Sequence, residues 1–579
     1  VATLTLAVAR ARSLSVLTTL VAPTTTVCAL VLTVAAALAG DASTAFVGVA
    51  LAGLGAALTW VALRPMVPAR PAEPELALAG TDALGFASAG MVTSDAARIW
   101  FRSPQRDAPH HVSLLNQGGE LLARATVTPR AVADGTAVVR APDDFDPAAP
   151  LEPDTTYFAR VAAADGRFSA EARFRTAPRR DATTEPFSLL VLSCHQPFDA
   201  DGRVRAGAMD LLRALPEACE ARGVRRVLLL GDQVYADEPI RLSLFDDDYF
   251  TRVGPEGADD IFACTREQVR ALWHQRHRMY WTPPAMQRLQ AGWATHMILD
   301  DHELIDNFGS AEAHHRAPWT TVREGALDAV YDYQSARCLP PDGDARPRRF
   351  SHALRHGPVI LYVADLRCDR RVDGDTATIM SDAQFAELEE TLREHGDAPI
   401  AIIALSVPIL HLPAWLVELG VTYTGEGSNI DDRWSAPNAR AQRARLLTIL
   451  HDWIAAQSGR RVVMVGGDVH VGAVTTLRWP DGITMHTLIS SAMSNLQPPA
   501  LREVAGSLPA APIRVEVGEH ELRGELLGGD GMPFTGLNAG FVHVRPNDAG
   551  ALDVELELIG ISDDAPGRPR TRIRVPVPS

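Results

Sequence analysis

Short motifs in the sequence place side chains that could bind metal ions directly after apolar runs. Asp232 follows such a run through Gly231, and Tyr235 comes three positions later. Asp468 and His470 follow another run, and their i, i+2 spacing puts both donors on one face of an extended segment. Carboxylate and imidazole groups suit divalent or ferric ions. A bound metal polarises a phosphoryl oxygen and makes hydroxide available at neutral pH, so phosphate ester chemistry is one candidate.

A second set of residues could supply acid–base and phosphate-binding groups. Asp301 and His302 stand side by side after a third apolar run, and Asn307 lies a few residues downstream. His302 could protonate a leaving oxygen. Arg367 and Arg370 follow a fourth run and could hold a phosphate, because the guanidinium group suits bidentate contacts.

The elements that must position these residues are five apolar runs, each read as a buried strand of a sheet that is covered on both faces. In layered α/β proteins, ligands bind at the carboxyl ends of such strands. A single run followed by acidic residues would be an ordinary strand, turn and helix. Five ends with compatible side chains predict one shared site. The runs cover residues 187–192, 226–230, 295–299, 358–364 and 461–465.

Length and composition limit the classes of function. A chain of 579 residues predicts several domains. The formal charge of −16 gives no basic surface for nucleic acid. The six cysteines contain no Cys-x-x-Cys pair, so neither a zinc ribbon nor a disulfide framework is expected. Nothing in the sequence indicates an oligomeric state.

Residues 1–70 differ from the rest, because no charge occurs between Arg12 and Asp41 or between Asp41 and Arg64. Each run reaches the roughly 20 residues that span a bilayer. We predict a hairpin of two transmembrane helices, at about residues 14–39 and 42–63, which makes the lipid bilayer a partner. Arginines at both outer ends favour a cytoplasmic catalytic domain in a multi-pass cell-membrane protein, with the extracellular side left open. The alternative is a signal peptide cleaved after residues 37–39.

The remaining chain predicts two further domains. Residues 80–178 carry short alternating segments separated by turn residues, typical of an antiparallel β-sandwich. The segment that ends at Tyr157 resembles the tyrosine corner of fibronectin type III domains. In residues 186–579 strands alternate with helices, which predicts a layered α/β fold that includes the C-terminal strands. Ser381 and Gln384 indicate a capping box at the start of one helix.

Five motifs in this order resemble the alkaline phosphatase D (PhoD-like) family of the calcineurin-like metallophosphatases: SCHQP, GDQVYADE, DDHELIDNFG, ADLRCDRR and GGDVHVG. The segment DRWSAPNARAQRARLL and the preceding β-domain also agree with that family. The resemblance implies an α/β (α+β) fold with a four-layer αββα catalytic domain. It further implies hydrolysis of phosphomonoesters or phosphodiesters at a site that holds ferric iron (Fe3+) and calcium (Ca2+). A dimetal site with Zn2+, Mn2+ or Mg2+ is the alternative.

Carried over by position, the resemblance implies a role for each candidate. Iron would be bound by Cys194 and Tyr235, and Asp232 would bridge to calcium. Asp301 and Asn307 compete for one ligand position, and His302 falls where the superfamily keeps its proton donor. The implied metal ligands are Cys194, Asp232, Tyr235, Asn307, Asp468 and His470. The implied catalytic residues are His302, Arg367 and Asp301, with Arg367 and Arg370 binding phosphate.

The predicted function is a membrane-anchored, metal-dependent phosphatase or phosphodiesterase, in which metal-activated hydroxide attacks a phosphate ester substrate. One alternative is a phosphodiesterase specific for lipid head groups or nucleotides. A second alternative, from a different class, is a non-catalytic membrane protein that binds phosphorylated ligands. The intact set of candidate ligands argues against loss of catalysis. Metal analysis, combined with activity on simple monoesters and diesters, discriminates between these readings.

Overall fold

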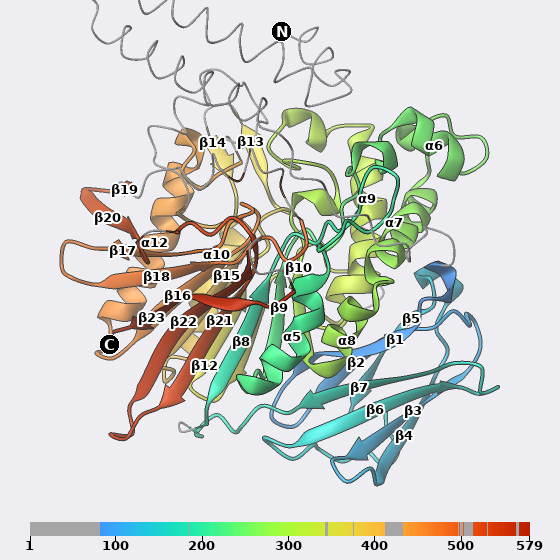
Figure 1. Ribbon diagram of the computed structural model, residues 1–579, viewed down its shortest axis with the longest axis horizontal. Helices are drawn as coiled ribbons and strands as arrows, with labels where there is room; N and C mark the ends of the chain where they lie inside the picture. The colour runs from blue at the N-terminus through green and yellow to red at the C-terminus, as the bar shows by residue number, and fades with distance from the viewer. Residues whose placement is uncertain are drawn as a thin grey trace, which may run out of the picture. The chain divides into compact units, whose positions relative to one another are not determined.

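A computed structural model describes residues 81–578, except for 183–184, 342–345, 374–375, 411–431, 496, 498–501, 503–512, 530 and 563–566. The compact unit considered below comprises Ala72–Leu496 and Leu508–Ser579. Its described residues form a mixed α/β fold, as predicted from the alternation of strands and helices (Figure 1).

The first seven strands form two antiparallel sheets, with the orders β1-β2-β5 and β4-β3-β6-β7. Side chains from both sheets, among them Ile99 and Val161, share one buried cluster. The phenol oxygen of Tyr157 accepts a hydrogen bond from the Glu152 backbone N–H at 2.8 Å, which is the contact of a tyrosine corner. The strands are β1 (Phe86–Val92), β2 (Ala97–Arg102), β3 (His110–Asn116), β4 (Leu121–Val127), β5 (Thr136–Ala141), β6 (Thr156–Ala163) and β7 (Ser169–Arg175).

A six-stranded sheet with the order β10-β9-β8-β21-β22-β23 joins the two ends of the α/β region. Its three parallel strands are the first three apolar runs of the sequence, and every residue in them is buried. The C-terminal strands continue the sheet in antiparallel fashion from β8. The strands are β8 (Phe187–Leu192), β9 (Arg226–Leu230), β10 (Ala294–Ile298), β21 (Leu537–Pro546), β22 (Leu552–Ile561) and β23 (Arg570–Val577).

An eight-stranded sheet has the order β11-β12-β15-β16-β18-β17-β20-β19, and β12, β15, β16 and β18 run parallel. The short β13 (Arg371–Asp373) and β14 (Thr376–Thr378) form a separate hairpin. The eight strands are β11 (His352–His356), β12 (Val359–Val363), β15 (Ile400–Leu405), β16 (Arg461–Gly466), β17 (Ala473–Arg478), β18 (Thr484–Ile489), β19 (Ile513–Val517) and β20 (His520–Leu526).

Alternate residues of the eight-stranded sheet pack on opposite sides, which layers the fold. Leu361 shares a buried cluster with Leu190 of the other sheet. Its neighbour Tyr362 instead joins a cluster with Phe385 of α10 and Leu447 of α12. Ser381 caps α10 by accepting from the Gln384 backbone N–H, as predicted, but the Gln384 side chain bonds the Asp365 backbone and does not complete a capping box. The α-helices are α5 (Asp210–Ala221), α6 (Asp247–Val253), α7 (Arg266–Trp281), α8 (Pro284–Gly292), α9 (Trp319–Val330), α10 (Asp382–Glu394) and α12 (Arg440–Ala455).

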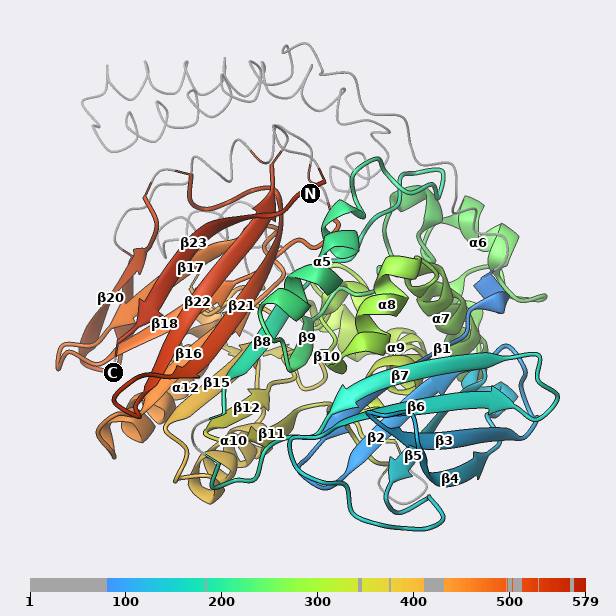
Figure 2. The ribbon, with the colours of Figure 1, turned by 60° about the horizontal axis from the view of Figure 1, so that its bottom comes forward.

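The β-sandwich is joined to the α/β region by backbone hydrogen bonds as well as by packing. Helix α8 contacts β1 and β7 (Figure 2). The Met91 N–H donates to the Arg337 carbonyl at 2.9 Å, and the Arg98 guanidinium donates to the Ala336 carbonyl, also at 2.9 Å. The segment 336–339 is therefore held against the sandwich.

The structure corrects the prediction of a multi-pass membrane protein. Within the residues it describes, no helix combines the length and the apolar character needed to cross a bilayer. The two spans predicted at about residues 14–39 and 42–63 lie outside the described residues.

Candidate active site

Five of the six predicted metal ligands share a left-handed backbone conformation that residues other than glycine rarely adopt. Eight described non-glycine residues have this conformation, so more than half of them belong to the predicted site. It costs an ordinary L-residue of order 1–3 kcal/mol and concentrates at functional sites. The φ angles are 58° at Cys194, 54° at Asp232, 58° at Asn307, 60° at Asp468 and 54° at His470.

Gly231 allows the ends of β9 and β10 to approach each other. Its φ is +97°, and a Cβ atom built on it would lie 2.3 Å from the Cβ of Asp300. No other residue type fits such a contact without displacing the backbone. The glycine therefore brings Asp232, at the end of β9, beside the acidic pair that follows β10.

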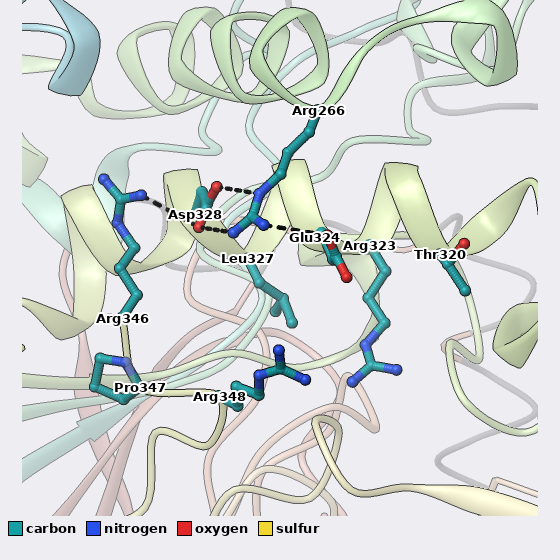
Figure 3. A pocket seen from close by; sticks show the side chains of 9 residues that line it. All are labelled: Arg266, Thr320, Arg323, Glu324, Leu327, Asp328, Arg346, Pro347 and Arg348. Carbon is teal, nitrogen blue, oxygen red and sulfur yellow. Dashed lines mark hydrogen bonds and ion pairs between the residues drawn. The ribbon is translucent and has the colours of Figure 1, made fainter. Parts of the chain in front are cut away.

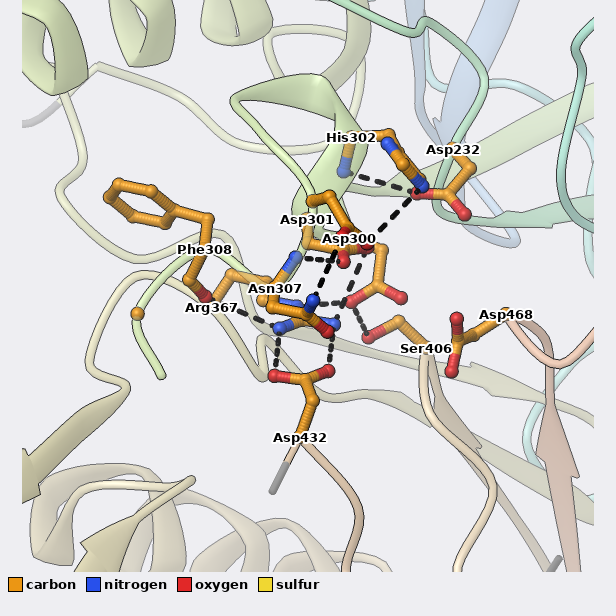
Figure 4. Close-up of polar contacts among 12 residues, drawn as sticks. Asp232, Asp300, Asp301, His302, Asn307, Phe308, Arg367, Ser406, Asp432 and Asp468 are labelled. Atoms are coloured by element: carbon orange, nitrogen blue, oxygen red, sulfur yellow. Dashed lines mark hydrogen bonds and ion pairs between the residues drawn. The ribbon is translucent and has the colours of Figure 1, made fainter. Parts of the chain in front are cut away.

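Four carboxylates meet at these strand ends: Asp232, Asp300, Asp301 and Asp468 (Figure 4). One oxygen from each lies within 4.8 Å of the others. Burial, and then the proximity of Asp301, raises the pKa of Asp232 well above its usual value. Burial also raises the pKa of Asp300 to about 6. Among the described atoms, Asp300 Oδ2 and Asp301 Oδ1 accept no hydrogen bond. Crowded carboxylates with unused oxygens are the donor set that hard cations require, so these residues fit metal ions.

Cys194 and Tyr235 approach the same carboxylate. The sulfur of Cys194 lies 3.3 Å from Asp232 Oδ2, and the Tyr235 phenol oxygen lies 3.4 Å from it. Ser491 Oγ donates to the sulfur at 3.0 Å. Burial raises the pKa of both the thiol and the phenol. Deprotonation of either group therefore needs a cation nearby, and a soft ligand beside hard oxygens suits a strongly Lewis-acidic ion.

His470 and Asp468 belong to the same site as Cys194 and Tyr235. Burial lowers the pKa of His470 to about 3, so its imidazole is neutral, as a ligand must be. Asn495 Nδ2 lies 3.3 Å from His470 Nε2 and 3.2 Å from the Tyr235 phenol oxygen. Asp468 Oδ2 forms an ion pair with Arg433. The structure thus brings these predicted ligands to one place, and their binding of metal stays a prediction.

Asp301 and Asn307, the two candidates for one ligand position, are adjacent. The Asn307 backbone N–H donates to Asp301 Oδ2 at 2.5 Å. The Asn307 amide donates to Asp306 at 2.9 Å, which leaves its carbonyl oxygen for another partner. Because Asp301 Oδ1 accepts no hydrogen bond among the described residues, both side chains keep an oxygen for a cation.

His302 is oriented by Asp237, a residue not predicted for the site. Its Nδ1 lies 2.9 Å and 3.0 Å from the two Asp237 oxygens, and its ring stacks on Tyr235 at 4.3 Å. Burial alone would lower the pKa of His302, but the carboxylates of Asp237 and Asp301 raise it well above its usual value. These carboxylates favour the protonated imidazole, in which Nε2 can deliver a proton.

Arg367 is engaged by carboxylates rather than open to a ligand. It is fully buried, and its Nε donates to Asp300. Its two terminal nitrogens each donate to Asp432 at 2.7 Å. This geometry holds Asp300 in place and disagrees with direct phosphate binding by Arg367, since all three nitrogens are occupied. Arg370 contacts Asp432 at 3.0 Å, and its Nη1 has no hydrogen-bond partner among the described residues.

We expect Arg367→Ala to lower the free energy of unfolding by about 3–5 kcal/mol, because it leaves Asp300 buried without its cation and Asp432 paired with Arg370 alone. Urea denaturation of the purified protein measures this. The control is Arg393→Ala, which removes an exposed pair with Glu390 and should change stability by less than about 1 kcal/mol. Equal losses of stability in the two variants would show that the buried ion pairs of Arg367 stabilise the protein no more than an exposed pair does.

Several site residues were missed by the sequence interpretation. Asp237 and Asp300 lie inside two of the five motifs, next to other acidic residues. That acidic pattern could have indicated that they belong to the site. Asp432 and Arg433 belong to the segment that resembles the family, but nothing there indicates that they face the strand ends. Asn495 lies in a loop after β18 with no recognisable pattern.

A separate pocket lies between α7, α9 and the segment 346–348 (Figure 3). Arg266 pairs there with Asp328 at 2.7 Å. Arg323 and Arg348 also line it, and neither has a carboxylate within ion-pair distance among the described residues. None of the predicted site residues lines this pocket, so it is distinct from the carboxylate cluster.

Comparisons with known proteins agree with this geometry. The sequence model of a family described as "PhoD-like phosphatase" matches residues 189–508. A solved structure, "Structure of PhoD", superposes with a TM-score of 0.58 at 15% identity, covering 88% of this chain and 90% of that one. A β-glucuronidase from Ruminococcus gnavus matches with a TM-score of only 0.24 at 10% identity, covering 66% of this chain and 53% of that one. No curated protein sequence matches the chain.

Proposed function

The chain belongs to the PhoD-like phosphatase family and is a phosphoric ester hydrolase, and from this premise we propose that the cluster of Asp232, Asp300, Asp301 and Asp468 is its metal-dependent catalytic centre. The observation that supports this proposal is the convergence of buried carboxylates with unused oxygens at the carboxyl ends of parallel strands. Such crowding is unfavourable without cations to neutralise it. Phosphomonoesters and phosphodiesters are both proposed substrates.

The proposed ions are ferric iron and calcium, with a Zn2+, Mn2+ or Mg2+ pair as the alternative. Cys194 and Tyr235 would hold the iron, and Asp232 would contact both ions. Asp468, His470 and either Asp301 or Asn307 would complete the set. When bound, such ions supply Lewis acidity that polarises a phosphoryl oxygen and makes hydroxide available at neutral pH.

The chain's own groups provide positioning and a proton. Asp237 holds the imidazole of His302 through Nδ1, which leaves Nε2 as the atom that gives a proton to the leaving oxygen. Arg367 fixes Asp300, and through Asp432 it also fixes the position of Arg370. Arg370 Nη1, which is buried and has no hydrogen-bond partner among the described residues, is the proposed phosphate contact.

Metal analysis joined to activity assays tests this function. We expect the purified protein to contain stoichiometric metal, to hydrolyse a simple monoester or diester, and to lose that activity when a chelator removes the metal. The metal-depleted protein should recover activity when the ions are restored. Full activity in a protein shown to be free of metal would overturn the proposal.

His302→Ala should lower turnover far more for alkyl phosphates than for activated aryl phosphates. An alkoxide is a poor leaving group that needs a proton, and general acid catalysis is worth roughly 10²–10⁴-fold. Steady-state kcat values for matched alkyl and aryl substrates measure the difference. Asp237→Asn should show the same selectivity at smaller size, because it weakens the orientation of His302 and the rise in its pKa but keeps the imidazole. Equal losses on both substrates would instead assign His302 to the metal site or to structure.

A further inference from the structure

A second cluster of metal-binding side chains lies away from the carboxylates, where the edges of the two large sheets meet. His296 is on β10, the edge strand of the six-stranded sheet, and His352 is on β11, the edge strand of the eight-stranded sheet. Cys338 comes from the segment that is hydrogen-bonded to the β-sandwich. All three side chains are buried, and their donor atoms lie within 4.8 Å of one another.

The separations of these donor atoms match those around a tetrahedral ion. His296 Nδ1 lies 3.1 Å from His352 Nε2 and 3.5 Å from the Cys338 sulfur. Metal–nitrogen bonds of about 2.0–2.1 Å and a metal–sulfur bond of about 2.3 Å, at tetrahedral angles, separate the donors by about 3.3 Å and about 3.6 Å. The third separation, between His352 Nε2 and the Cys338 sulfur, lies within 4.8 Å, so one ion fits between the three atoms once that pair closes to the tetrahedral spacing.

The hydrogen bonds fix the form of His352 that a metal needs. Its Nδ1 lies 3.0 Å from the Phe350 carbonyl, which can only accept, so Nδ1 carries the proton. Nε2, which lies 3.1 Å from His296 Nδ1, then carries the lone pair. Metal-bound histidines characteristically donate their other nitrogen to such a carbonyl. Burial lowers the pKa of His352 to about 4 and that of His296 well below its usual value, so both rings are neutral.

Cys338 is a buried thiol that has three arginines nearby. Burial raises the pKa of Cys338 to about 12, while Arg337, Arg98 and Arg226 act in the opposite direction. Arg226 is fully buried and has no carboxylate within ion-pair distance among the described residues. These cations disfavour a highly charged ion, and a d10 ion accepts three or four ligands without a preferred geometry.

We propose that His296, His352 and Cys338 form a structural binding site for one thiophilic d10 cation, Zn2+ or Cu+. The site joins the edge strands of both sheets to the segment that holds the β-sandwich. It contains no member of the carboxylate cluster, so it stabilises the fold and leaves the hydrolytic chemistry unchanged. Metal loss should therefore loosen the junction between the sandwich and the α/β region.

Metal stoichiometry of the full-length chain tests the site. We expect Cys338→Ser to bind one equivalent less Zn2+, or less Cu+ under anaerobic reducing conditions, than the wild type, and the ion that shows the difference identifies the occupant. Cys219→Ser is the matched control, because Cys219 is also a buried free thiol but belongs to no group of metal ligands among the described residues. Its stoichiometry should equal that of the wild type.

Stability and activity provide independent readouts. The ion should raise the denaturation midpoint of the wild type and of Cys219→Ser but not that of Cys338→Ser or His352→Gln. Phosphoester hydrolysis by Cys338→Ser should stay within about twofold of the wild type, which separates this site from the catalytic metals. Equal metal content in Cys338→Ser and Cys219→Ser, for both ions, would overturn the proposal and leave a hydrogen-bonded cluster only.

Discussion

Replacing Asp232 by Asn should lower kcat by at least about 10³-fold while the protein stays folded. The Asp232 carboxylate lies within 3.4 Å of the Cys194 sulfur, the Tyr235 phenol and the His302 backbone N–H, so it occupies the centre of the proposed site. An amide keeps the shape but removes the negative charge that would hold the two proposed cations. Losing that interaction costs several kcal/mol of transition-state stabilisation, and each 1.36 kcal/mol is tenfold in rate.

The same substitution should act in the opposite direction on stability. Because Asp232 is buried among other carboxylates that raise its pKa, the metal-free wild type carries unfavourable charge crowding. Asp232→Asn removes one of these negative charges. We therefore expect the metal-depleted variant to resist urea at least as well as the metal-depleted wild type at neutral pH.

Steady-state kinetics on an aryl phosphate and urea denaturation after chelation measure the two effects together. The control is Asp382→Asn, which removes a carboxylate that is 91% exposed at the start of α10 and should leave kcat unchanged. An Asp232→Asn protein that is inactive because it is unfolded would contradict the argument. So would a variant with less than a tenfold loss of kcat.

The sequence predicted the strand ends because the relevant physics is local. Four consecutive apolar residues before Gly231 and Asp232 favour a strand that is buried on both faces and has its polar end at the sheet edge. The left-handed backbone at Cys194 carries no comparable signal, because cysteine does not favour that conformation. Residue types and spacing therefore indicated the site, whereas its backbone geometry became visible only in the structure.

Contacts between distant segments were not predictable in the same way. An arginine that follows a strand looks the same in sequence whether it faces a substrate or a carboxylate. Arg367 was assigned to phosphate, yet Asp432, which is 65 residues away, occupies its terminal nitrogens. The pairing of β21 with β8 likewise depends on strands at opposite ends of the α/β region. Such long-range pairings follow from the whole topology rather than from any local pattern.

Cys194→Ala should remove the proposed iron and most of the hydrolytic activity while part of the calcium binding survives. The thiol is fully buried and 3.3 Å from Asp232, and burial raises its pKa, so it becomes a thiolate only beside a strongly Lewis-acidic ion. Magnesium and calcium have little use for a sulfur ligand, whereas the neighbouring carboxylates suit them. The variant therefore separates the two proposed ions.

The colour of the protein gives a readout that does not depend on activity. Thiolate and phenolate bonds to ferric iron absorb visible light by charge transfer, so we expect the purified wild type to be coloured. Tyr235→Phe should shift or bleach the band, because the phenol oxygen that approaches Asp232 is removed while the ring can still stack on His302. Cys368→Ala is the matched control, because Cys368 is a buried free thiol outside the predicted ligand set, and its band should be unchanged.

Absorption spectra and metal analysis of the four proteins decide between the iron site and an ordinary dimetal centre. Loss of both iron and the visible band in Cys194→Ala, with the band kept in Cys368→Ala, would support iron at Cys194 and Tyr235. A colourless wild type that is fully active with only zinc or manganese would refute it. Unchanged metal content in Cys194→Ala would refute it too, because a thiol held this close to Asp232 cannot be removed from an iron site without weakening it.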